Sequence, residues 1–446
     1  MMVVVCASTI SSMWHKTSAS VLCKKVWDMR RLASFSLMLF ALLGLGHIVG
    51  GSPPAMAQEE LSRALSRMAP VVGRPQEYQR KGAESIYRIA RRFDVSANAV
   101  HNANESSLNA GGEKLRIPGQ HIVPVAGASG IVINLPERNL YLYRDGEPPK
   151  VYPIAIGMRG WETPTGSFKI ANKRKNPTWF PPKWAVQEEP VPPGPDNPLG
   201  DRWMGLSAPG YGIHATNAPA SVGRYASHGC MRMYPENARD LYAQVGVGTP
   251  VRIIYERAVI GYLPDDGIVY LAYHPDPYQD GDVAPEDVRD MLKDYGLESV
   301  ADLDVIGDIL KRPTGMPTPV VGSHTTVTVN GKRVAFALAP VPVNSDWLVP
   351  AGPLARALGA GTQIGPRLAY VVIERGDRRL FFSPGSPEAL VNRELIQVSA
   401  APRIAAGYPL VPIRTTAEAL GASVQWDEAS REIRIWDGIG RMLGTL

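Results

Sequence analysis

Apolar residues follow three different patterns along the chain, each confined to its own stretch. Residues 32–49 form one unbroken apolar run. Near residues 86–93, apolar positions recur at i, i+3, i+4 and i+7, which predicts one face of a helix. From residue 129 onward, runs such as 131–135 and 140–143 have period-two patterning and are bounded by turn residues. The chain therefore predicts a small helical unit followed by a mainly β domain.

The apolar run has the surroundings of an export signal. It follows two arginines and precedes Ala-Met-Ala at residues 55–57, a small-residue cleavage pattern. Together these features predict a secretory signal peptide over residues 1–57, cut before Gln58, with Met29 as the true start. The protein is therefore expected in the periplasm or cell wall. An uncleaved membrane anchor is the alternative interpretation.

Charge and composition exclude several classes of function. The chain has 47 Lys and Arg against 42 Asp and Glu, a formal net charge of +5. Residues 1–57 hold five of the basic residues and one acidic residue, so the rest of the chain is close to neutral. A neutral body argues against a nucleic-acid partner, which needs a concentrated basic face. A hydrophobic share of 45% argues against disorder, and a single long apolar run argues against a polytopic membrane protein.

Residues 76–120 predict a small βααβ unit, preceded by a polar linker over residues 58–75. Its first helix carries the apolar face described above, and Ser96 is expected to cap the second helix. The stretches 85–93 and 115–120 resemble a LysM module. That resemblance implies a module that binds the glycan strands of peptidoglycan. A helical hairpin without a ligand is the alternative.

Residues 125–257 predict the mainly β domain, with one helix that begins near Pro235 and a strand at 251–255. Residues 175–203 contain eight prolines and three tryptophans, which excludes a regular helix or central strand. A loop of this length suggests a lid over a binding site, or equally a structural cover for the sheet.

Candidate chemistry gathers in residues 213–216 and 227–233. The chain has three cysteines, and two of them precede residue 57, so Cys230 is the lone thiol of the mature protein. A cysteine nucleophile needs its thiolate, and an imidazole nearby can take the proton. Backbone N–H groups around His228, Gly229 and Cys230 can stabilise an oxyanion, and Gly229 permits the backbone conformation that such a turn needs.

The same segments resemble the signature of YkuD-type L,D-transpeptidases, a His followed by a Ser-His-Gly-Cys block. The resemblance extends over residues 129–256 and includes 163–168 and 248–251. It implies a YkuD-type β-sandwich with one or two helices, of the kind found in the periplasmic subgroup. It also implies an enzyme that needs no cofactor and no metal.

The resemblance also implies the roles of single residues. Cys230 would be the nucleophile and His214 the general base, with the carbonyl of Ala215 orienting His214. His228 and Gly229 would shape the pocket and the oxyanion hole.

Three further residues are expected on the substrate side of the site. Arg232 matches an arginine of the family and could bind a substrate carboxylate. For Ser227 and Arg224 a scaffolding role is favoured, and both are kept as candidates for substrate binding.

The implied reaction is acyl transfer on peptidoglycan stem peptides. Cys230 would attack the amide between the third residue and D-Ala at position four, releasing D-Ala and leaving a thioester. An amine from another stem, giving a 3–3 cross-link, or a lysine of a lipoprotein would resolve it. Resolution by water would make the enzyme an L,D-carboxypeptidase.

Other classes of function remain open at this point. His214, His228 and Cys230 could form a zinc site, although their spacing is tighter than usual ligand patterns. A cysteine endopeptidase or a non-catalytic wall-binding scaffold would also fit parts of the sequence.

The last third of the chain contains an internal repeat. Leu-Val-Pro at 348–350 leads to Ala-Leu-Gly-Ala at 357–360, and both motifs recur 62 residues later. Residues 258–315 are expected to extend the catalytic domain. Residues 323–438 resemble the copper amine oxidase N-terminal domain, which implies an α+β stalk. This stretch has no clustered ligands, so no copper is expected.

Overall fold

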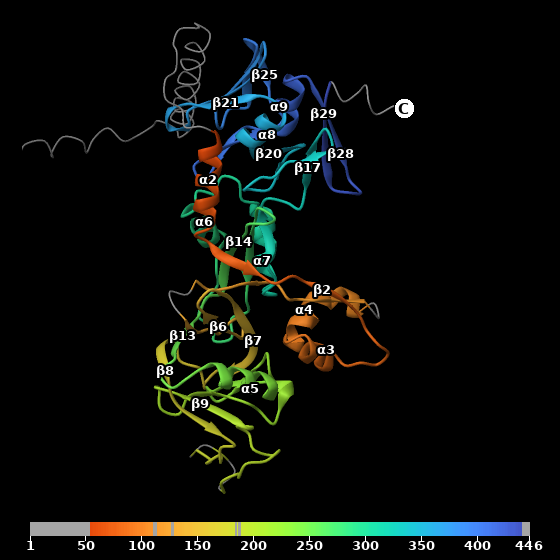
Figure 1. The fold of residues 1–446 in the computed structure, drawn as a ribbon. Helices are drawn as coiled ribbons and strands as arrows, with labels where there is room; N and C mark the ends of the chain where they lie inside the picture. The colour runs from red at the N-terminus through yellow and green to blue at the C-terminus, as the bar shows by residue number, and fades with distance from the viewer. Residues whose placement is uncertain (1–53, 110–113, 126–128, 183–184, 186–188, 439–446) are drawn as a thin grey trace, which may run out of the picture.

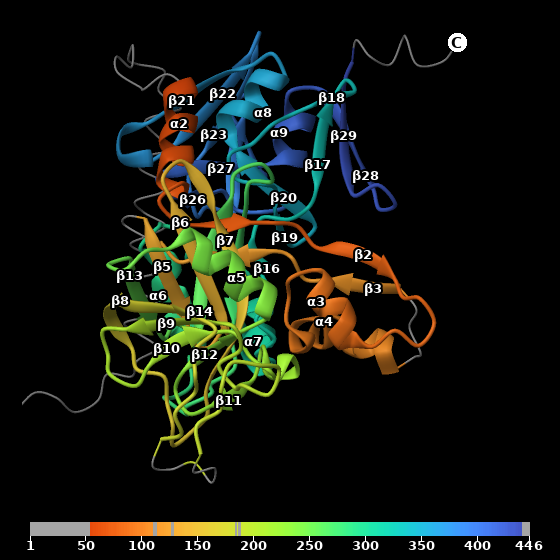
Figure 2. The same ribbon diagram turned by 60° about the horizontal axis from the view of Figure 1, so that its bottom comes forward.

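The computed structural model describes residues 54–109, 114–125, 129–182, 185 and 189–438. The predicted signal run and the predicted start at Met29 lie outside these residues. Figures 1 and 2 show an elongated molecule, with a β domain at one end, the C-terminal repeat at the other and a small sheet between them. None of the helices within the described ranges has the length and apolar character that crossing a membrane requires.

The β domain holds nine strands in the order β11-β7-β12-β10-β9-β8-β13-β5-β6, and β7 also pairs with β6. The sheet therefore closes on itself into a sandwich. Their bounds are β5 Gly130–Asn134, β6 Asn139–Arg144, β7 Glu147–Gly157, β8 Gly166–Lys175, β9 Arg202–Leu206, β10 Gly212–His214, β11 Tyr225–Ser227, β12 Met231–Met233 and β13 Pro250–Ile254.

The two long strands β7 and β8 connect the halves of the sandwich. The first part of β7 pairs with β6, and its end pairs with β12 and β11. The first part of β8 pairs with β13, and its second part pairs with β9 after a register shift near Ile170. A bulge of this kind bends a strand, which lets one strand serve both halves. The predicted mainly β sandwich is confirmed.

One helix, α5 Pro235–Gln244, packs on this domain. It begins with the expected proline, and Ala238 and Leu241 on its apolar face are fully buried. They join the core between the halves, to which Ile133, Ile154 and Met231 also belong. A 3-10 turn, η1 Pro219–Ser221, lies in the loop before β11.

The βααβ unit has the predicted elements, β2 Gln76–Gln79, α3 Ile86–Arg92, α4 Ala97–Asn109 and β3 Lys114–Ile117. Strands β2 and β3 are antiparallel partners. The hydroxyl of Ser96 accepts from the N–H of Ala99 at 3.1 Å, which is the expected cap. The unit also docks on the β domain through the Arg91 guanidinium, which donates to both carboxylate oxygens of Glu236.

The middle of the molecule is a sheet that the sequence did not predict, with the order β16-β15-β14-β1-β4. Its strands are β1 Ala69–Val72, β4 His121–Ile122, β14 Ala258–Leu263, β15 Ile268–Tyr273 and β16 Thr318–Val321, and helices α2 Pro54–Leu65, α6 Pro285–Lys293 and α7 Leu303–Lys311 belong to the same region.

Two expectations are corrected by this central sheet. Residues 58–75 are not a polar linker, because Leu61 and Leu65 are buried in its core and β1 pairs with β14. Residues 258–315 pair with β1 and β16 instead of extending the catalytic sheet.

The C-terminal repeat is built from two equivalent sets of elements and five additional strands. The first set is β19 Val341–Val343, β20 Asp346–Pro350, α8 Ala351–Ala357, β21 Gly361–Ile364 and β22 Val371–Arg375, and the second is β26 Arg403–Ala405, β27 Tyr408–Pro412, α9 Ile413–Ala419, β28 Ala422–Asp427 and β29 Glu432–Asp437. The additional elements are β17 Thr326–Val329, β18 Lys332–Arg333, β23 Arg378–Phe382, β24 Glu388–Val391, β25 Glu394–Gln397 and the 3-10 turn η2 Pro366–Leu368.

The two sets are related by an approximate two-fold axis. Their inner strands form one sheet with the order β19-β20-β27-β26. In this sheet Val349 lies opposite Val411, and these residues are separated by the repeat length of 62. Equivalent residues thus face each other across the antiparallel pair. The predicted internal repeat is confirmed, and helices and strands of both sets share one hydrophobic cluster.

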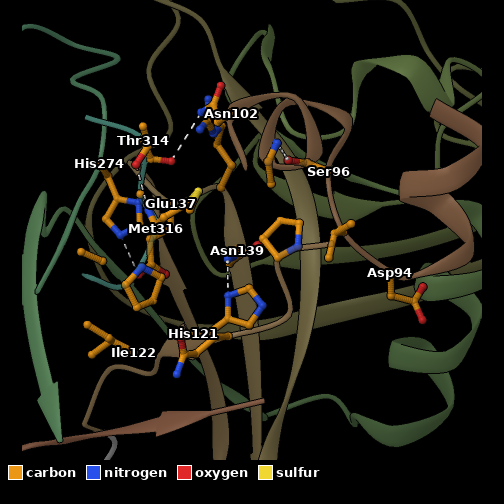
Figure 3. A pocket seen from close by; sticks show the side chains of 18 residues that line it. Asp94, Ser96, Asn102, His121, Ile122, Glu137, Asn139, His274, Thr314 and Met316 are labelled. Carbon is orange, nitrogen blue, oxygen red and sulfur yellow. Dashed lines mark hydrogen bonds and ion pairs between the residues drawn. The ribbon is translucent and has the colours of Figure 1, made fainter. Parts of the chain in front are cut away.

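A small polar cavity of about 70 Å³ lies where the βααβ unit, the β domain and the central sheet meet (Figure 3). His121 and His274 come from the central sheet region, and Glu137 comes from the turn between β5 and β6. A carboxylate oxygen of Glu137 lies 3.2 Å from Nε2 of His274. Burial lowers the pKa of His121. The contact between Glu137 and His274 joins the β domain to the central sheet.

The central core generates the first prediction. We use the name central unit for the central sheet together with helices α2, α6 and α7. We expect Leu65→Ala to lower the free energy of unfolding of this central unit by about 2–5 kcal/mol, because the substitution leaves a cavity in a closed core. Urea unfolding followed by circular dichroism measures this. Ser62→Ala, at an exposed position of the same helix, is the matched control. Equal effects of the two substitutions would mean that α2 is dispensable.

Candidate active site

The predicted thiol and imidazoles line one cleft of about 530 Å³ in the β domain. His214 ends β10, Arg232 lies beside it on β12, and the two residues are cross-strand partners. Cys230 occupies the turn between β11 and β12. The cleft is lined by Asn172, Arg174, Pro177, Thr178, Trp179, Phe180, Pro182, Pro198, Leu199, Trp203, Gly210, His214, Ser227, His228, Cys230 and Arg232.

The turn that carries Cys230 needs glycine at position 229. Gly229 has φ of +101°, and a Cβ there would lie 2.6 Å from the ring of Tyr211. Ser227 closes the turn, because its hydroxyl accepts from the N–H of Gly229 at 3.1 Å and donates to the carbonyl of Cys230 at 2.6 Å. Ser227 is buried and its hydrogen bonds are those of a scaffold, the role that the sequence favours for it.

A second set of hydrogen bonds holds the same turn from behind. The hydroxyl of Thr163 donates to the carbonyl of Gly229 at 2.9 Å and accepts from the N–H of Gly157 at 3.0 Å. The hydroxyl of Tyr278 accepts from the N–H of Thr163 at 3.0 Å and donates to the carbonyl of Gly157 at 3.1 Å. Tyr278 lies in the segment after β15, so the central unit contributes to the support of the turn.

His214 is buried, with 4% of its surface exposed. Its Nδ1 lies 2.5 Å from the carbonyl oxygen of Ala215, as the sequence predicted. A carbonyl can only accept, so Nδ1 carries the proton and Nε2 carries the lone pair. The ring stacks on Trp203 with centroids 5.8 Å apart. Burial lowers the pKa of His214 to about 4, so the imidazole is neutral at neutral pH.

Cys230 is half-buried and is the one free cysteine in the part of the chain that the structure describes. Its Sγ lies 3.4 Å from the carbonyl oxygen of Gly210. Burial raises the pKa of the Cys230 thiol, and the backbone of Gly212 and the charge of Arg232 oppose that rise. The thiol and the imidazole are therefore both neutral at rest.

The remaining predicted residues fall into two groups. Arg232 and His228 line the cleft, and the ring of His228 packs edge-on against Trp161 at 4.8 Å. Arg224 is not among the cleft residues. Its guanidinium lies over the ring of Tyr87 in the βααβ unit, 5.4 Å from the ring centre. Arg224 therefore stabilises the contact between two units, and its expected place on the substrate side is corrected.

Sequence reasoning missed three residues that shape the site, namely Thr163, Trp203 and Tyr278. Thr163 belongs to a stretch that resembles the family, but no local pattern shows that its hydroxyl bridges Gly157 and Gly229. Trp203 was counted only as part of the Pro-rich loop. Tyr278 is 48 positions from Cys230, and only the fold brings its hydroxyl to the turn.

The described side chains of the cleft do not group as metal ligands. Among residues 54–438 that are described, no three or more His, Cys, Asp or Glu side chains group in a way that could hold a metal ion. The zinc alternative therefore lacks a ligand set in this structure.

Comparison with known proteins identifies the family of the β domain. Residues 128–253 match the L,D-transpeptidase catalytic domain. Over 256 residues the chain is 32% identical to the probable L,D-transpeptidase YcfS of Escherichia coli strain K12, which covers 53% of this chain and 80% of that protein. The chain belongs to the L,D-transpeptidase family. It is also 33% identical over 249 residues to the probable L,D-transpeptidase YbiS of the same strain, covering 51% of this chain and 81% of that one. A match to the putative L,D-transpeptidase YkuD of Bacillus subtilis strain 168 has 35% identity over 187 residues, 40% of this chain and 97% of the relative.

These matches confirm the predicted YkuD-type domain and show that the protein is an acyl-transferring enzyme. Residues 328–435 match the copper amine oxidase N-terminal domain, which confirms the resemblance given for the C-terminal repeat. Membership of the L,D-transpeptidase family favours catalysis over the scaffold and endopeptidase alternatives.

The hydroxyl of Tyr278, which links Thr163 to Gly157, generates a prediction about the turn that carries Cys230 in this L,D-transpeptidase. Tyr278→Phe removes the hydroxyl that satisfies the N–H of Thr163 and the carbonyl of Gly157. Local opening of the turn should become more frequent. We expect iodoacetamide to modify Cys230 roughly fivefold faster or more, measured on the Cys230 peptide by mass spectrometry.

Tyr143→Phe is the matched control, because Tyr143 also donates its hydroxyl to a backbone carbonyl, that of Pro124, away from the turn. In Tyr143→Phe, iodoacetamide should modify Cys230 at the same rate as in the protein without a substitution. If Tyr278→Phe matches this control, Tyr278 does not support the turn.

Proposed function

We propose that this L,D-transpeptidase acts on peptidoglycan stem tetrapeptides through a thioester on Cys230. The observation that carries the proposal is the common cleft of Cys230, His214 and Arg232, two of them cross-strand partners. The expected products are 3–3 cross-links or a protein joined to the wall. Hydrolysis of the thioester, giving a trimmed stem, is the competing outcome.

His214 acts as the general base in this proposal. Its Nδ1 proton is held by the carbonyl of Ala215, which leaves Nε2 to accept the proton of the Cys230 thiol. Because both groups are neutral at rest, the proton moves as sulfur attacks the substrate carbonyl. This differs from a preformed thiolate and imidazolium pair, which the burial of both groups disfavours.

The oxyanion that forms needs backbone donors close to the sulfur. The N–H of Gly229 already donates to the hydroxyl of Ser227, so it is not available for this role. We assign the role to the N–H of Cys230 itself. His228 also lines the cleft and is proposed to shape the pocket.

The two half-reactions balance in protons and bonds. Sulfur attacks the carbonyl carbon of the third residue, the C–N bond to D-Ala breaks, and the leaving amine takes the proton from Nε2 of His214. An acceptor amine then attacks the thioester, gives a proton to His214 and forms the new amide, and the thiol is regenerated. Arg232, beside the thiol, is suited to hold the terminal carboxylate of the leaving D-Ala.

The Pro-rich loop forms one wall of the cleft through Trp179, Phe180 and neighbouring residues. The loop is an ordered structure in its described parts. Trp179 and Val191 exchange two backbone hydrogen bonds of 2.9 Å. The buried side-chain amide of Asn197 donates to the carbonyls of Pro177, Val191 and Pro192. We propose that this wall limits the access of water to the thioester.

The flanking units suit a protein of the cell wall. The βααβ unit is proposed to bind glycan strands, as its resemblance to LysM modules implies. The export signal over residues 1–57 would deliver the enzyme to its polymeric substrate. A lysine-bearing lipoprotein is an alternative acceptor for the acyl group.

The central experiment incubates the protein with tetrapeptide muropeptides and analyses products and protein by mass spectrometry. We expect D-Ala release, a thioester adduct on Cys230 and cross-linked dimers. Cys230→Ala should abolish all three, and His214→Gln should lower kcat about 10²- to 10⁴-fold, because a positioned general base contributes that much. His101→Gln, at an exposed position of α4, is the control. Release of D-Ala by Cys230→Ala would refute the mechanism.

The loop wall generates a separate prediction. Phe180 has 66% of its surface exposed and lines the cleft. Phe180→Ala should raise the ratio of hydrolysed to transferred product several-fold, roughly three or more, because water reaches the thioester more easily. Val247→Ala is the matched control, since Val247 is equally exposed and lies outside the cleft. An unchanged ratio in Phe180→Ala would show that the wall does not exclude water.

A further inference from the structure

Four cleft residues form a straight row across neighbouring strands. Arg174 on β8 lies opposite Trp203 on β9, Trp203 lies opposite His214 on β10, and His214 lies opposite Arg232 on β12. All four side chains line the same cleft. The row therefore places one guanidinium on each side of the buried imidazole.

The two arginines are unequally distant from His214. Neighbouring strands are about 4.8 Å apart. The backbone of Arg232 is one strand from His214, and that of Arg174 is two strands away on the other side, roughly 10 Å. An extended peptide advances about 3.4 Å for each residue. A peptide laid along the row would thus reach Arg174 within about three residues of the reacting carbonyl.

The aromatic residue between them is held in a fixed position. Nε1 of Trp203 donates to Oδ1 of Asn172 at 2.9 Å. The indole lies over Gly212, where a Cβ would come within 2.5 Å of the ring, and a Cβ at Gly205 would lie 2.9 Å from Nε1. The missing side chains leave room for the ring. The indole ring of Trp203 therefore forms the surface of the cleft between Arg174 and His214.

Arg174 is free to bind a ligand in the structure. Its backbone pairs with that of Trp203, and its guanidinium makes no ion pair or hydrogen bond with the side chains or backbone of the described residues. The residue before it, Lys173, points to the opposite face, where its ammonium donates to the carbonyls of Tyr242 and Val245. Alternation along a strand places Asn172 and Arg174 on the cleft side and Lys173 and Lys175 on the other.

We propose that Arg174 forms a second carboxylate-binding subsite, which takes an acidic group on the acyl side of the scissile amide. Arg232 would hold the carboxylate of the leaving residue, and Arg174 a carboxylate within about three residues upstream of it. The donor is then a peptide with acidic groups on both sides of the bond that breaks. This inference rests on the proposed function, because it takes the reacting carbonyl to lie between Cys230 and His214.

The test compares two donor peptides that differ only in the upstream group, a free carboxylate in one and a carboxamide in the other. The unmodified protein should show a KM roughly tenfold lower for the carboxylate donor, because a guanidinium–carboxylate hydrogen bond is charge-assisted. Arg174→Gln should remove that preference and leave kcat nearly unchanged. Arg174→Lys should restore part of it.

Lys175→Gln is the matched control, since it removes the same charge from the next residue, on the opposite face of β8. It should leave both KM values unchanged. The proposal is overturned if Arg174→Gln changes both donors equally, if it changes neither, or if Lys175→Gln has the same effect.

A binding measurement separates this inference from the proposed reaction. In a Cys230→Ala background, calorimetry gives Kd for both donors without turnover, with and without Arg174→Gln. Turnover is measured separately with Cys230 intact. If that protein acts on neither donor, but the preference in Kd for the carboxylate donor depends on Arg174, the subsite is supported and the proposed reaction fails. If the protein with Cys230 intact releases D-Ala, but the Kd values in the Cys230→Ala background do not depend on Arg174, the reaction is supported and the subsite is refuted.

Discussion

The turn that carries Cys230 is the constraint on which the site depends. A short loop with a left-handed glycine at its centre has few contacts of its own, so other segments must hold it. Ser227 holds the turn from within, and Thr163 holds the carbonyl of Gly229 from the loop after β7. Tyr278 fixes Thr163 and Gly157 from the central unit. The sulfur is therefore positioned by side-chain hydroxyls from three parts of the chain, each bonded to backbone groups, which explains why hydroxyl residues recur around it.

Burial gives this arrangement its chemical character. Removing the thiol and the imidazole from water disfavours their charged forms, so the pKa of Cys230 rises and that of His214 falls. A neutral pair has low reactivity until a carbonyl approaches the sulfur. The same dry environment strengthens each hydrogen bond to the developing oxyanion. Low reactivity at rest also protects the Cys230 thiol, because a permanent thiolate would be open to oxidation.

The elements that the sequence predicted correctly are those specified by residues close together in the chain. The βααβ unit, the strands of the β domain and the repeat all follow from periodicity or from motifs within a few tens of residues. The His and Cys segments were found because the family motif is contiguous. The central sheet was missed because β1 pairs with β14, about 190 positions later, and residues 58–75 look polar when read alone. The sequence leaves the role of Arg224 open between scaffolding and substrate binding, because an arginine gives no local sign of whether it faces a substrate or the ring of Tyr87.

The central sheet also changes how the domains of this enzyme should be understood. Its core contains Leu65 from α2, Leu271 from β15 and Leu410 from the C-terminal repeat, so three distant stretches share one hydrophobic cluster. The segment that leaves β15 at Tyr273 then supplies Tyr278 to the catalytic turn. A rigid central unit restricts the positions of that segment more than a free tail would. The geometry of the thiol thus depends on packing that lies outside the catalytic sandwich, and the catalytic domain cut at residue 257 would lose one support of its turn.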